Sequence, residues 1–365
     1  MSSVWGLVFS TLLGLFGGHN QVLSASVGSW ALPNNKFGLY IYSVNDYASA
    51  AATLVNSNGG DWGYVLVPYA VYDTDIEKWR GFFLELHKDN LIPIIQLWDL
   101  RNSEDTQHAA EFLDSLPWPT TIHYVSVYNE PNDSRFWYNK VDPAGYAAVL
   151  DQTITTFKKQ NSAFFMLNGA FNASARNGNG YMDEVDYVTA MNKAVPGIFK
   201  RLDGWASHPY PQPNFSGSLA DTGRDSIKAY DWELSLLKDK FGVNNLPVFI
   251  TETGWAHQEG VTPDYSFYTA DQTAALIKEA YEQVWLPDPR IIAVTPFTIK
   301  YSHPEDHFNW LDPENKPYPQ FYAIQQMPKV AGKPTESPWY LFYPDIRQII
   351  IDLFDRATLR VNTNM

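Results

Sequence analysis

The feature that most constrains the fold is a regular alternation of short apolar runs with longer amphipathic stretches between residues 37 and 328. The short runs have the composition of buried strands, and the longer stretches have the periodicity of helices. The predicted strands are residues 37–42, 63–68, 91–98, 122–130, 164–169, 203–208, 247–253 and 291–299. The predicted helices are residues 46–56, 75–89, 105–115, 143–160, 181–195, 226–241, 268–285 and 318–327. Strands that alternate with helices in this way form parallel sheets.

Eight strand and helix pairs close most simply into a barrel of parallel strands. The main rival is a doubly wound open sheet, which would place a glycine-rich phosphate-binding turn after the first strand. The sequence there is YSVND, residues 42–46, and it contains no glycine. We therefore predict an α/β fold, a single (β/α)8 TIM barrel over residues 31–328. Capping or first-turn residues support the helix starts, namely Asp75, Asp105, Asp142 before Pro143, Ser226 and Thr269.

The two ends of the chain lie outside this barrel. Residues 4–18 form an uncharged apolar run of about 15 residues, which is short for a membrane span and fits the core of an export signal. No Lys or Arg precedes the run. We assign residues 1–30 to a signal peptide or an N-terminal anchor and expect a secreted or envelope-associated protein. Residues 329–365 are an extension, in which the apolar pattern of 343–360 suits a helix packed on the barrel, with partner binding as the alternative.

Composition excludes several functions. Lys and Arg total 26 against 40 for Asp and Glu, so the net charge of −14 would repel a phosphate backbone, and we expect no nucleic-acid partner. The chain has no cysteine, which excludes disulfides, thiol nucleophiles and cysteine-ligated metals. Aromatic residues make up 15% of the chain, more than an ordinary core needs. We expect a monomer that acts on a carbohydrate, for the reasons that follow.

Two predicted strands end in glutamate. Strand four closes with YNEPN at residues 128–132, which contains Glu130, and strand seven closes with ITETGW at residues 250–255, which contains Glu252. Functional groups of such barrels gather at the carboxyl ends of the strands, and two carboxyl groups across one mouth are what cleavage of a glycosidic bond requires. Either motif alone is more often a loop with a solvated acid. Their joint placement on strands four and seven favours a catalytic pair.

These motifs carry a family resemblance over residues 37–328. The chain resembles a clan A glycoside hydrolase, and within that clan family 39 and the related family 5. The resemblance implies that Glu130 is the acid/base, that Glu252 is the nucleophile, and that Asn129 donates to the sugar 2-hydroxyl. The sequence His208-Pro209-Tyr210, which closes strand six, matches the His-x-Tyr of the clan. It implies that the Tyr210 hydroxyl steadies the nucleophile and that His208 lines the subsite.

The implied activity is hydrolysis of a β-linked poly- or oligosaccharide by a retaining double displacement, without a cofactor. A retaining enzyme holds its two carboxyl groups about 5 to 5.5 Å apart. The acid/base needs a raised pKa, whereas the nucleophile needs hydrogen-bond donors that keep it ionised. Tyr210 and Asn129 are the expected donors to Glu252. Many clan members also carry an arginine on strand two; this chain has none there, and Arg101 either substitutes for it or is an ordinary loop residue.

Aromatic residues cluster at the same strand ends, where flat rings can pack on the C–H faces of sugars. Tyr42, Trp98 and Phe297 belong to this group. We predict Trp137, Trp255 and Trp310 as the stacking platforms.

Two other functions remain open. The first is a catalytically inactive barrel that binds carbohydrate. The second is a metal-dependent hydrolase that uses His303 and His307, but Pro304 opposes a helix presenting both rings, and no third ligand is evident. We therefore predict no metal site.

Overall fold

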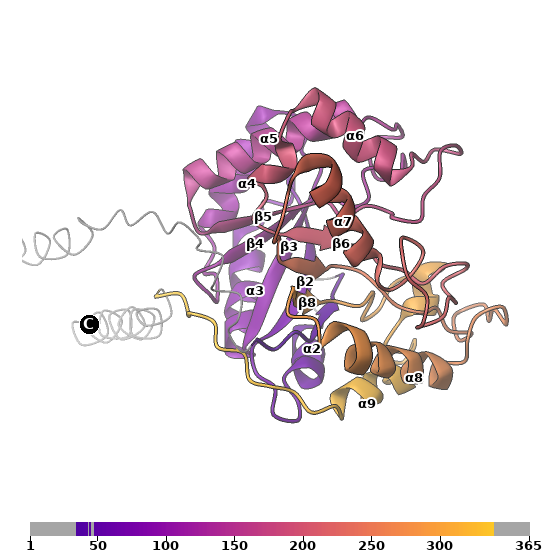
Figure 1. The fold of residues 1–365 in the computed structure, drawn as a ribbon. Helices are drawn as coiled ribbons and strands as arrows, with labels where there is room; N and C mark the ends of the chain where they lie inside the picture. The colour runs from indigo at the N-terminus through magenta and orange to yellow at the C-terminus, as the bar shows by residue number, and fades with distance from the viewer. Residues whose placement is uncertain (1–33, 43, 45–46, 339–365) are drawn as a thin grey trace, which may run out of the picture. The chain divides into compact units, whose positions relative to one another are not determined.

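The computed structural model describes residues 34–42, 44 and 47–338, and it contains all eight predicted strands and all eight predicted helices. The strands are β1 (Gly38–Tyr40), β2 (Gly63–Ala70), β3 (Leu91–Trp98), β4 (His123–Val127), β5 (Phe164–Asn168), β6 (Trp205–Ser207), β7 (Val248–Ile250) and β8 (Ile291–Val294). The helices are α2 (Ala48–Val55), α3 (Ile76–Lys88), α4 (Ser103–Asp114), α5 (Pro143–Gln160), α6 (Glu184–Ala194), α7 (Ala229–Phe241), α8 (Ala270–Ala280) and α9 (Pro319–Gln325). Figure 1 shows the helices placed around the strands.

The strands form a closed parallel barrel. β1 to β5 pair in order as one sheet, and β6 to β8 pair as a second. A parallel bridge between Phe37 and Val294 closes the seam from β1 to β8, and another between Leu167 and Gly204 closes the seam from β5 to β6. At the second seam the side chain of Asn168 donates to the Ala206 carbonyl at 3.0 Å and accepts from its amide at 2.9 Å. A side-chain amide thus takes the place of part of the backbone ladder.

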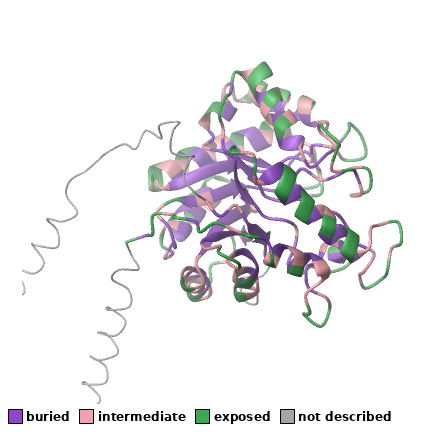
Figure 2. Ribbon diagram, turned by 60° about the horizontal axis from the view of Figure 1, so that its bottom comes forward, coloured by how far each residue is buried: buried purple, intermediate pink, exposed green. Residues whose placement is uncertain are grey.

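The barrel strands and the helices around them differ in solvent exposure. The strands are buried, while the outer faces of the helices are exposed (Figure 2). Inside the barrel, aromatic rings from four strands pack together. The ring centre of Tyr124 lies 5.2 Å from those of Phe249 and Phe165 and 6.1 Å from that of Tyr64. This aromatic layer fills the interior from the amino-terminal side, so the interior is a packed core and chemistry is confined to the carboxyl ends.

Four of the five predicted capping or first-turn residues are confirmed, Asp105 as a first-turn residue of α4, and Ser226 is wrong. The side chains of Asp75, Asp142 and Thr269 each accept a hydrogen bond from a first-turn amide. For α4 the cap is Asn102 rather than Asp105, because the extended backbone of Asn102 lets its side chain accept from two amides, one of them that of Asp105. α7 begins at Ala229, and the hydroxyl of Ser226 lies in the turn before it.

The described part of the C-terminal extension crosses the amino-terminal ends of the strands. Gly332 N donates to the Asp61 carbonyl at 2.8 Å, and Ser337 N donates to the Pro119 carbonyl at 3.1 Å. The helix expected at 343–360 and the segment 1–30 fall outside the described residues. Within residues 34–338 as described, no helix combines the length and the apolar character that a membrane crossing needs.

Candidate active site

Glu130 stands on an irregular turn that leaves β4. The φ angle is +73° at Tyr128 and +36° at Glu130, which is the left-handed region that residues with a side chain seldom adopt. Glu130 N donates to the Ala170 carbonyl at 2.9 Å, and Tyr128 OH donates to the Leu100 carbonyl at 2.8 Å. Such backbone persists only where surrounding contacts hold it, and it is concentrated at functional sites.

Glu252 is fixed between the two strands that flank β7. Thr251 N donates to the Ser207 carbonyl at 3.1 Å, and Thr253 Oγ1 donates to the Pro209 carbonyl at 2.8 Å. On the other side, Phe297 N donates to the Thr253 carbonyl at 3.0 Å. The carboxyl end of β7 is therefore tied to both β6 and β8, and Glu252 has little freedom to move.

The two carboxyl groups meet at one imidazole. Nδ1 of His208 lies 3.0 Å from Glu130 Oε1 and 3.8 Å from Glu252 Oε2. These two oxygens are therefore at most about 7 Å apart, which is the sum of the two distances. Glu130 and Glu252 are 8% and 7% exposed, so each carboxyl is mostly enclosed but still reaches solvent. The structure thus brings together the two glutamates that lie on strand ends 122 residues apart in sequence.

Two further predicted residues belong to the same group. Tyr210 OH donates a hydrogen bond to Glu252 Oε2 at 3.0 Å, the contact that the resemblance implies. Asn129 is buried, and its Oδ1 accepts from Gln96 Nε2 at 3.2 Å. Because the oxygen of this amide is occupied, the NH2 group of Asn129 is the end that can donate to a ligand.

Gln96 is a site residue that the sequence analysis missed. It lies on β3, and its own Oε1 accepts from Trp98 Nε1 at 3.0 Å. It also stabilises the charge of Glu252 by hydrogen bonding. The sequence does contain an indication of this role. Gln96 is the one polar residue in the strand LIPIIQLW, and a buried amide inside an apolar strand needs hydrogen-bond partners.

The electrostatics of the site differ from the expectation for Glu252. The pKa of Glu252 is raised to about 7: burial raises it most and the charge of Glu130 adds to this, while His208, Tyr210 and Gln96 lower it. Of the two predicted donors, Tyr210 donates to Glu252, and Gln96 acts on it where Asn129 was expected, but the penalty for burying the charge exceeds their effect. Burial lowers the pKa of His208, yet the charges of Glu252 and Glu130 outweigh burial, and the pKa of this imidazole is raised.

The predicted tryptophan platforms are wrong. Trp137, Trp255 and Trp310 are only 3%, 1% and 1% exposed, so none presents a ring face on which a sugar can stack. Trp137 packs edge-on against Tyr128 with ring centres 4.6 Å apart, and Trp255 Nε1 donates to the Gly217 carbonyl at 2.9 Å. At a strand end, an aromatic ring that anchors a loop gives the same sequence signal as one that faces a ligand.

Other aromatic rings are accessible at the strand ends. We call them the mouth aromatics; on one side they are Tyr42, Phe297, Tyr301, Phe308, Phe215 and Tyr210, which form a continuous series of ring contacts. On the other side Trp98 packs edge-on with Phe136 at 6.0 Å. Tyr42 is 54% exposed, and the others are partly exposed.

Arg101 does not act on Glu252. Its side chain is exposed, and its Nε pairs with Asp105 Oδ2 at 3.2 Å on the surface of α4. The alternative of an ordinary loop residue therefore holds. Gln96 and Tyr210 supply the hydrogen bonds to Glu252 instead.

The two histidines of the metal-hydrolase alternative have separate partners. His303 Nδ1 lies 3.1 Å from Asp306 Oδ1, while His307 is buried with Nδ1 2.8 Å from the His257 carbonyl. Among the described residues, no group of three His, Asp or Glu side chains is placed to hold a metal ion.

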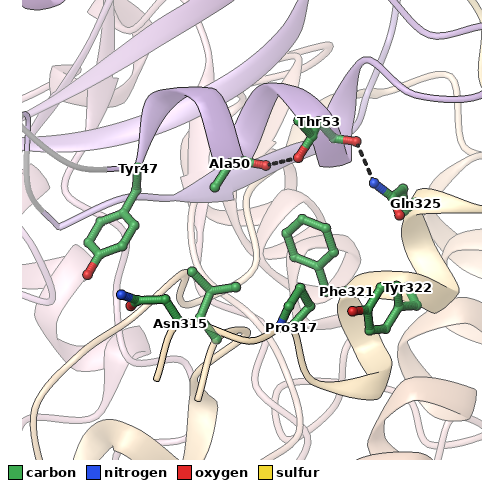
Figure 3. Close-up of a pocket in the computed structure, with 9 residues that line it drawn as sticks. Tyr47, Ala50, Thr53, Asn315, Pro317, Phe321, Tyr322 and Gln325 are labelled. Atoms are coloured by element: carbon green, nitrogen blue, oxygen red, sulfur yellow. Dashed lines mark hydrogen bonds between the residues drawn. The ribbon is translucent and has the colours of Figure 1, made fainter. Parts of the chain in front are cut away.

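A separate groove lies on the outside of the barrel between α2 and α9 (Figure 3). Its volume is about 740 Å³, and residues in and next to the two helices line it, including Tyr47, Thr53, Phe321 and Tyr322. Neither Glu130 nor Glu252 is among its lining residues. It is therefore distinct from the carboxyl pair.

Comparison with known proteins supports the fold. The chain matches no protein-family model and no curated protein sequence. Among solved structures it is similar to a GH128 (subgroup II) endo-beta-1,3-glucanase from Pseudomonas viridiflava, with a TM-score of 0.52 and 16% identity over 81% of this chain and 99% of that one. It is also similar to AbfB, a family 51 alpha-L-arabinofuranosidase from Bifidobacterium longum, with a TM-score of 0.51 and 12% identity over 81% of this chain and 72% of that one. The predicted fold class is confirmed.

Proposed function

We propose that the protein is a retaining glycoside hydrolase that cleaves β-glycosidic bonds in a poly- or oligosaccharide. The observation that carries this proposal is the meeting of Glu130 and Glu252 around one imidazole, at the ends of the fourth and seventh strands of the barrel. Inverting enzymes hold their carboxyl groups about 6.5 to 9.5 Å apart to admit a water molecule, and retaining enzymes about 5 to 5.5 Å. An upper limit of about 7 Å between the two oxygens excludes most of the inverting range and includes the retaining separation. The similar solved structures include glycosidases, which agrees with this assignment.

The reaction then has two steps. In the first, Glu252 attacks the anomeric carbon while Glu130 gives its proton to the leaving oxygen, so that one C–O bond breaks and a glycosyl ester forms. In the second, Glu130 takes a proton from water, the water oxygen attacks the anomeric carbon, and Glu252 is released as carboxylate. Asn129, whose amide nitrogen is free to donate, would bind the sugar 2-hydroxyl.

The first step requires the proton of the carboxyl pair to be on Glu130. Glu252 must then carry the charge, and hydrogen-bond donors favour the ionised form of a carboxyl group. Tyr210 and Gln96 stabilise the charge on Glu252. Above a pH of about 7 Glu252 is ionised, as a nucleophile must be.

The mouth aromatics give the site the character of a carbohydrate groove. They offer apolar ring faces beside the carboxyl pair, which pack on the C–H faces of sugars and leave hydroxyls free to hydrogen bond. Within the glycosidases we place the chain in clan A, near family 39 or family 5, because the His208-Pro209-Tyr210 sequence puts its tyrosine hydroxyl on the glutamate of strand seven. We also propose that the protein is exported and acts as a monomer.

The decisive experiment is removal and chemical rescue of the nucleophile. We expect Glu252→Ala to abolish hydrolysis of aryl β-glycosides, and azide to restore turnover with formation of the inverted glycosyl azide. Glu259→Ala is the matched control, because this glutamate lies seven residues further on and contacts His257 rather than the carboxyl pair. Full activity in Glu252→Ala would refute the assignment. If the wild-type protein bound an oligosaccharide without hydrolysing it, the alternative function, a catalytically inactive barrel that binds carbohydrate, would be supported instead.

A further inference from the structure

Arg135 lies just after the turn that carries Glu130, and a buried carboxylate fixes its position. Asp133 N donates to the Glu130 carbonyl at 2.8 Å, and the Asp133 side chain is only 1% exposed. Its Oδ2 accepts from Nε and Nη2 of Arg135 at 2.8 and 2.5 Å, and its Oδ1 accepts from the Arg135 backbone amide at 2.9 Å. A buried carboxylate that loses its cation destabilises the fold, so the guanidinium is held in this orientation.

One edge of this guanidinium remains free. An arginine side chain has five N–H donors in a rigid planar fork, and Asp133 binds only those of Nε and Nη2. Nη1 has no hydrogen-bond partner among the residues that the structure describes, and the Arg135 side chain is 64% exposed. A ligand oxygen that accepts from Nη1 would meet a side chain that is already ordered, so the entropic cost of binding is reduced.

Two partly exposed rings flank the guanidinium. Its central carbon lies over the rings of Phe136 and Tyr181, at 5.3 and 5.7 Å from their centres. Phe136 in turn packs edge-on against Trp98 with ring centres 6.0 Å apart. Arg135, Phe136 and Tyr181 therefore form a surface that continues from the aromatic side chains of the mouth. We call it the Arg135 shelf.

The Arg135 shelf lies on the leaving-group side of the proposed reaction. Glu130 gives its proton to the oxygen that departs with the leaving sugar, so this sugar lies next to Glu130. The shelf belongs to the segment that follows Glu130 directly, and the hydrogen bond from Asp133 N to the Glu130 carbonyl joins the two. Glu252, which bonds to the other sugar, stands at the end of β7 instead. The shelf is therefore placed to meet the sugar that leaves.

The charges around the shelf favour a neutral sugar. Asp133 compensates the positive charge of Arg135 at 2.5 Å, so the pair has no net charge with which to attract an anion. The two glutamates of the carboxyl pair lie in the same mouth, and the chain carries a net charge of −14. Sugar hydroxyls can accept from Nη1, a charged donor that binds more strongly than a neutral one, while C–H faces pack on the rings.

We propose that the Arg135 shelf is a binding site for a neutral sugar on the leaving side of the cleaved bond, with Nη1 of Arg135 donating to its hydroxyl groups. This inference rests on the proposed function and identifies where the departing part of the substrate binds. An aryl glycoside has no leaving sugar and makes no contact with the shelf. Arg135 therefore contributes to the hydrolysis of oligosaccharides and not to that of aryl glycosides.

The test compares these two classes of substrate. The probes are a nitrophenyl β-glycoside and the hexasaccharides of β-1,4-mannan, β-1,4-xylan, β-1,4-glucan and β-1,3-glucan. Arg135→Ala should lower kcat/KM for the hydrolysed hexasaccharide about tenfold, the effect of losing a hydrogen bond from a charged donor, and leave that for the aryl glycoside unchanged. Arg101→Ala is the matched control, because Arg101 is 62% exposed and pairs with Asp105 on the surface of α4. It should change neither value.

Arg135→Lys separates binding from a structural role. A lysine ammonium still compensates the charge of Asp133, so the Tm should stay near that of the wild type. It is a point charge without a second planar edge, however, and we expect the same tenfold loss for the hexasaccharide as in Arg135→Ala. A purely structural role would be restored by lysine. A loss that is equal for the two substrate classes, or wild-type hexasaccharide kinetics in either Arg135 variant, would overturn the inference.

Two further measurements distinguish the remaining outcomes. If the wild type prefers a hexasaccharide of β-1,4-mannuronate and Arg135→Ala removes that preference, the shelf binds an acidic sugar and the neutral assignment is wrong. If the wild type hydrolyses none of the probes, the proposed function fails, and calorimetric binding of the neutral hexasaccharides decides on the shelf. Weaker binding by both Arg135 variants than by Arg101→Ala would then support it. Equal binding by all variants, or no binding by the wild type, would overturn it.

Discussion

The hydroxyl of Tyr210 donates to Glu252 Oε2 at 3.0 Å, while His208, two residues earlier, lies 3.0 Å from Glu130. The end of β6 thus contacts both carboxyl groups, one through each side chain. Tyr210 favours the ionised form of Glu252, because a hydroxyl donor stabilises a carboxylate more than a carboxylic acid.

Replacing Tyr210 by Phe should therefore raise the pKa of Glu252 above about 7. A hydrogen bond to a charged group contributes about 1.5 to 3 kcal/mol, so we expect kcat/KM near neutral pH to fall roughly tenfold to hundredfold. The control is Tyr138→Phe, whose hydroxyl contacts Tyr128 and the Leu100 carbonyl. Equal pH profiles for wild type and Tyr210→Phe would show that this hydrogen bond has no part in ionising Glu252.

The pH dependence of the proposed activity follows from the same group. In the proposed reaction Glu252 must be ionised to attack, and its pKa is raised to about 7, so kcat/KM should decline as the pH falls through 7. An ordinary glutamate would keep the activity constant down to a pH of about 5. The measurement is kcat/KM for an aryl β-glycoside from pH 4 to 9. Constant activity between pH 5 and 8 would contradict the expected ionisation.

The stability of the fold should also depend on pH in a specific direction. The folded-state pKa values of Glu252 and Glu233 are raised to about 7 from 4.5, so the folded chain binds protons more tightly than the unfolded chain between these values. Their contribution to stability is fully present below pH 4.5 and is lost as the pH rises through 7. We expect the Tm to be lower at pH 8 than at pH 5. Glu233→Gln should reduce this difference, while Glu259→Gln, at a partly exposed position, should preserve it.

The sequence was sufficient for the barrel because each strand is buried on both faces and reads as a short apolar run. It was also sufficient to predict that Glu130 and Glu252 lie together, since the carboxyl ends of parallel strands must share one mouth. It was insufficient for the buried acids. Glu184 and Glu233 lie on helices whose composition suggests a solvated face, and only the packing of α6 and α7 shows that both are enclosed.

The aromatic residues also show that burial at a strand end cannot be predicted from the sequence. Trp137 and Trp98 both follow or end a strand and carry the same ring, yet Trp137 is buried and Trp98 is partly exposed. The exposed fraction of each ring depends on which loop covers it, and the periodicity of the sequence does not predict how the loops pack.

This difference predicts opposite effects for two tryptophan substitutions. Trp98→Ala should raise the KM for an oligosaccharide roughly tenfold, the consequence of losing about 1.4 kcal/mol of ring contact, with a small change in Tm. Trp137→Ala removes a ring packed against Tyr128 and should lower the stability by about 3 to 5 kcal/mol, with little effect on the KM of the molecules that remain folded. Because Trp98 Nε1 also donates to Gln96, Trp98→Phe separates the two contributions: it keeps an aromatic face but loses the donor. The measurements are steady-state kinetics and thermal unfolding for all three variants. A raised KM in Trp137→Ala together with an unchanged KM in Trp98→Ala would reverse the assignment and return Trp137 to the role of a sugar platform.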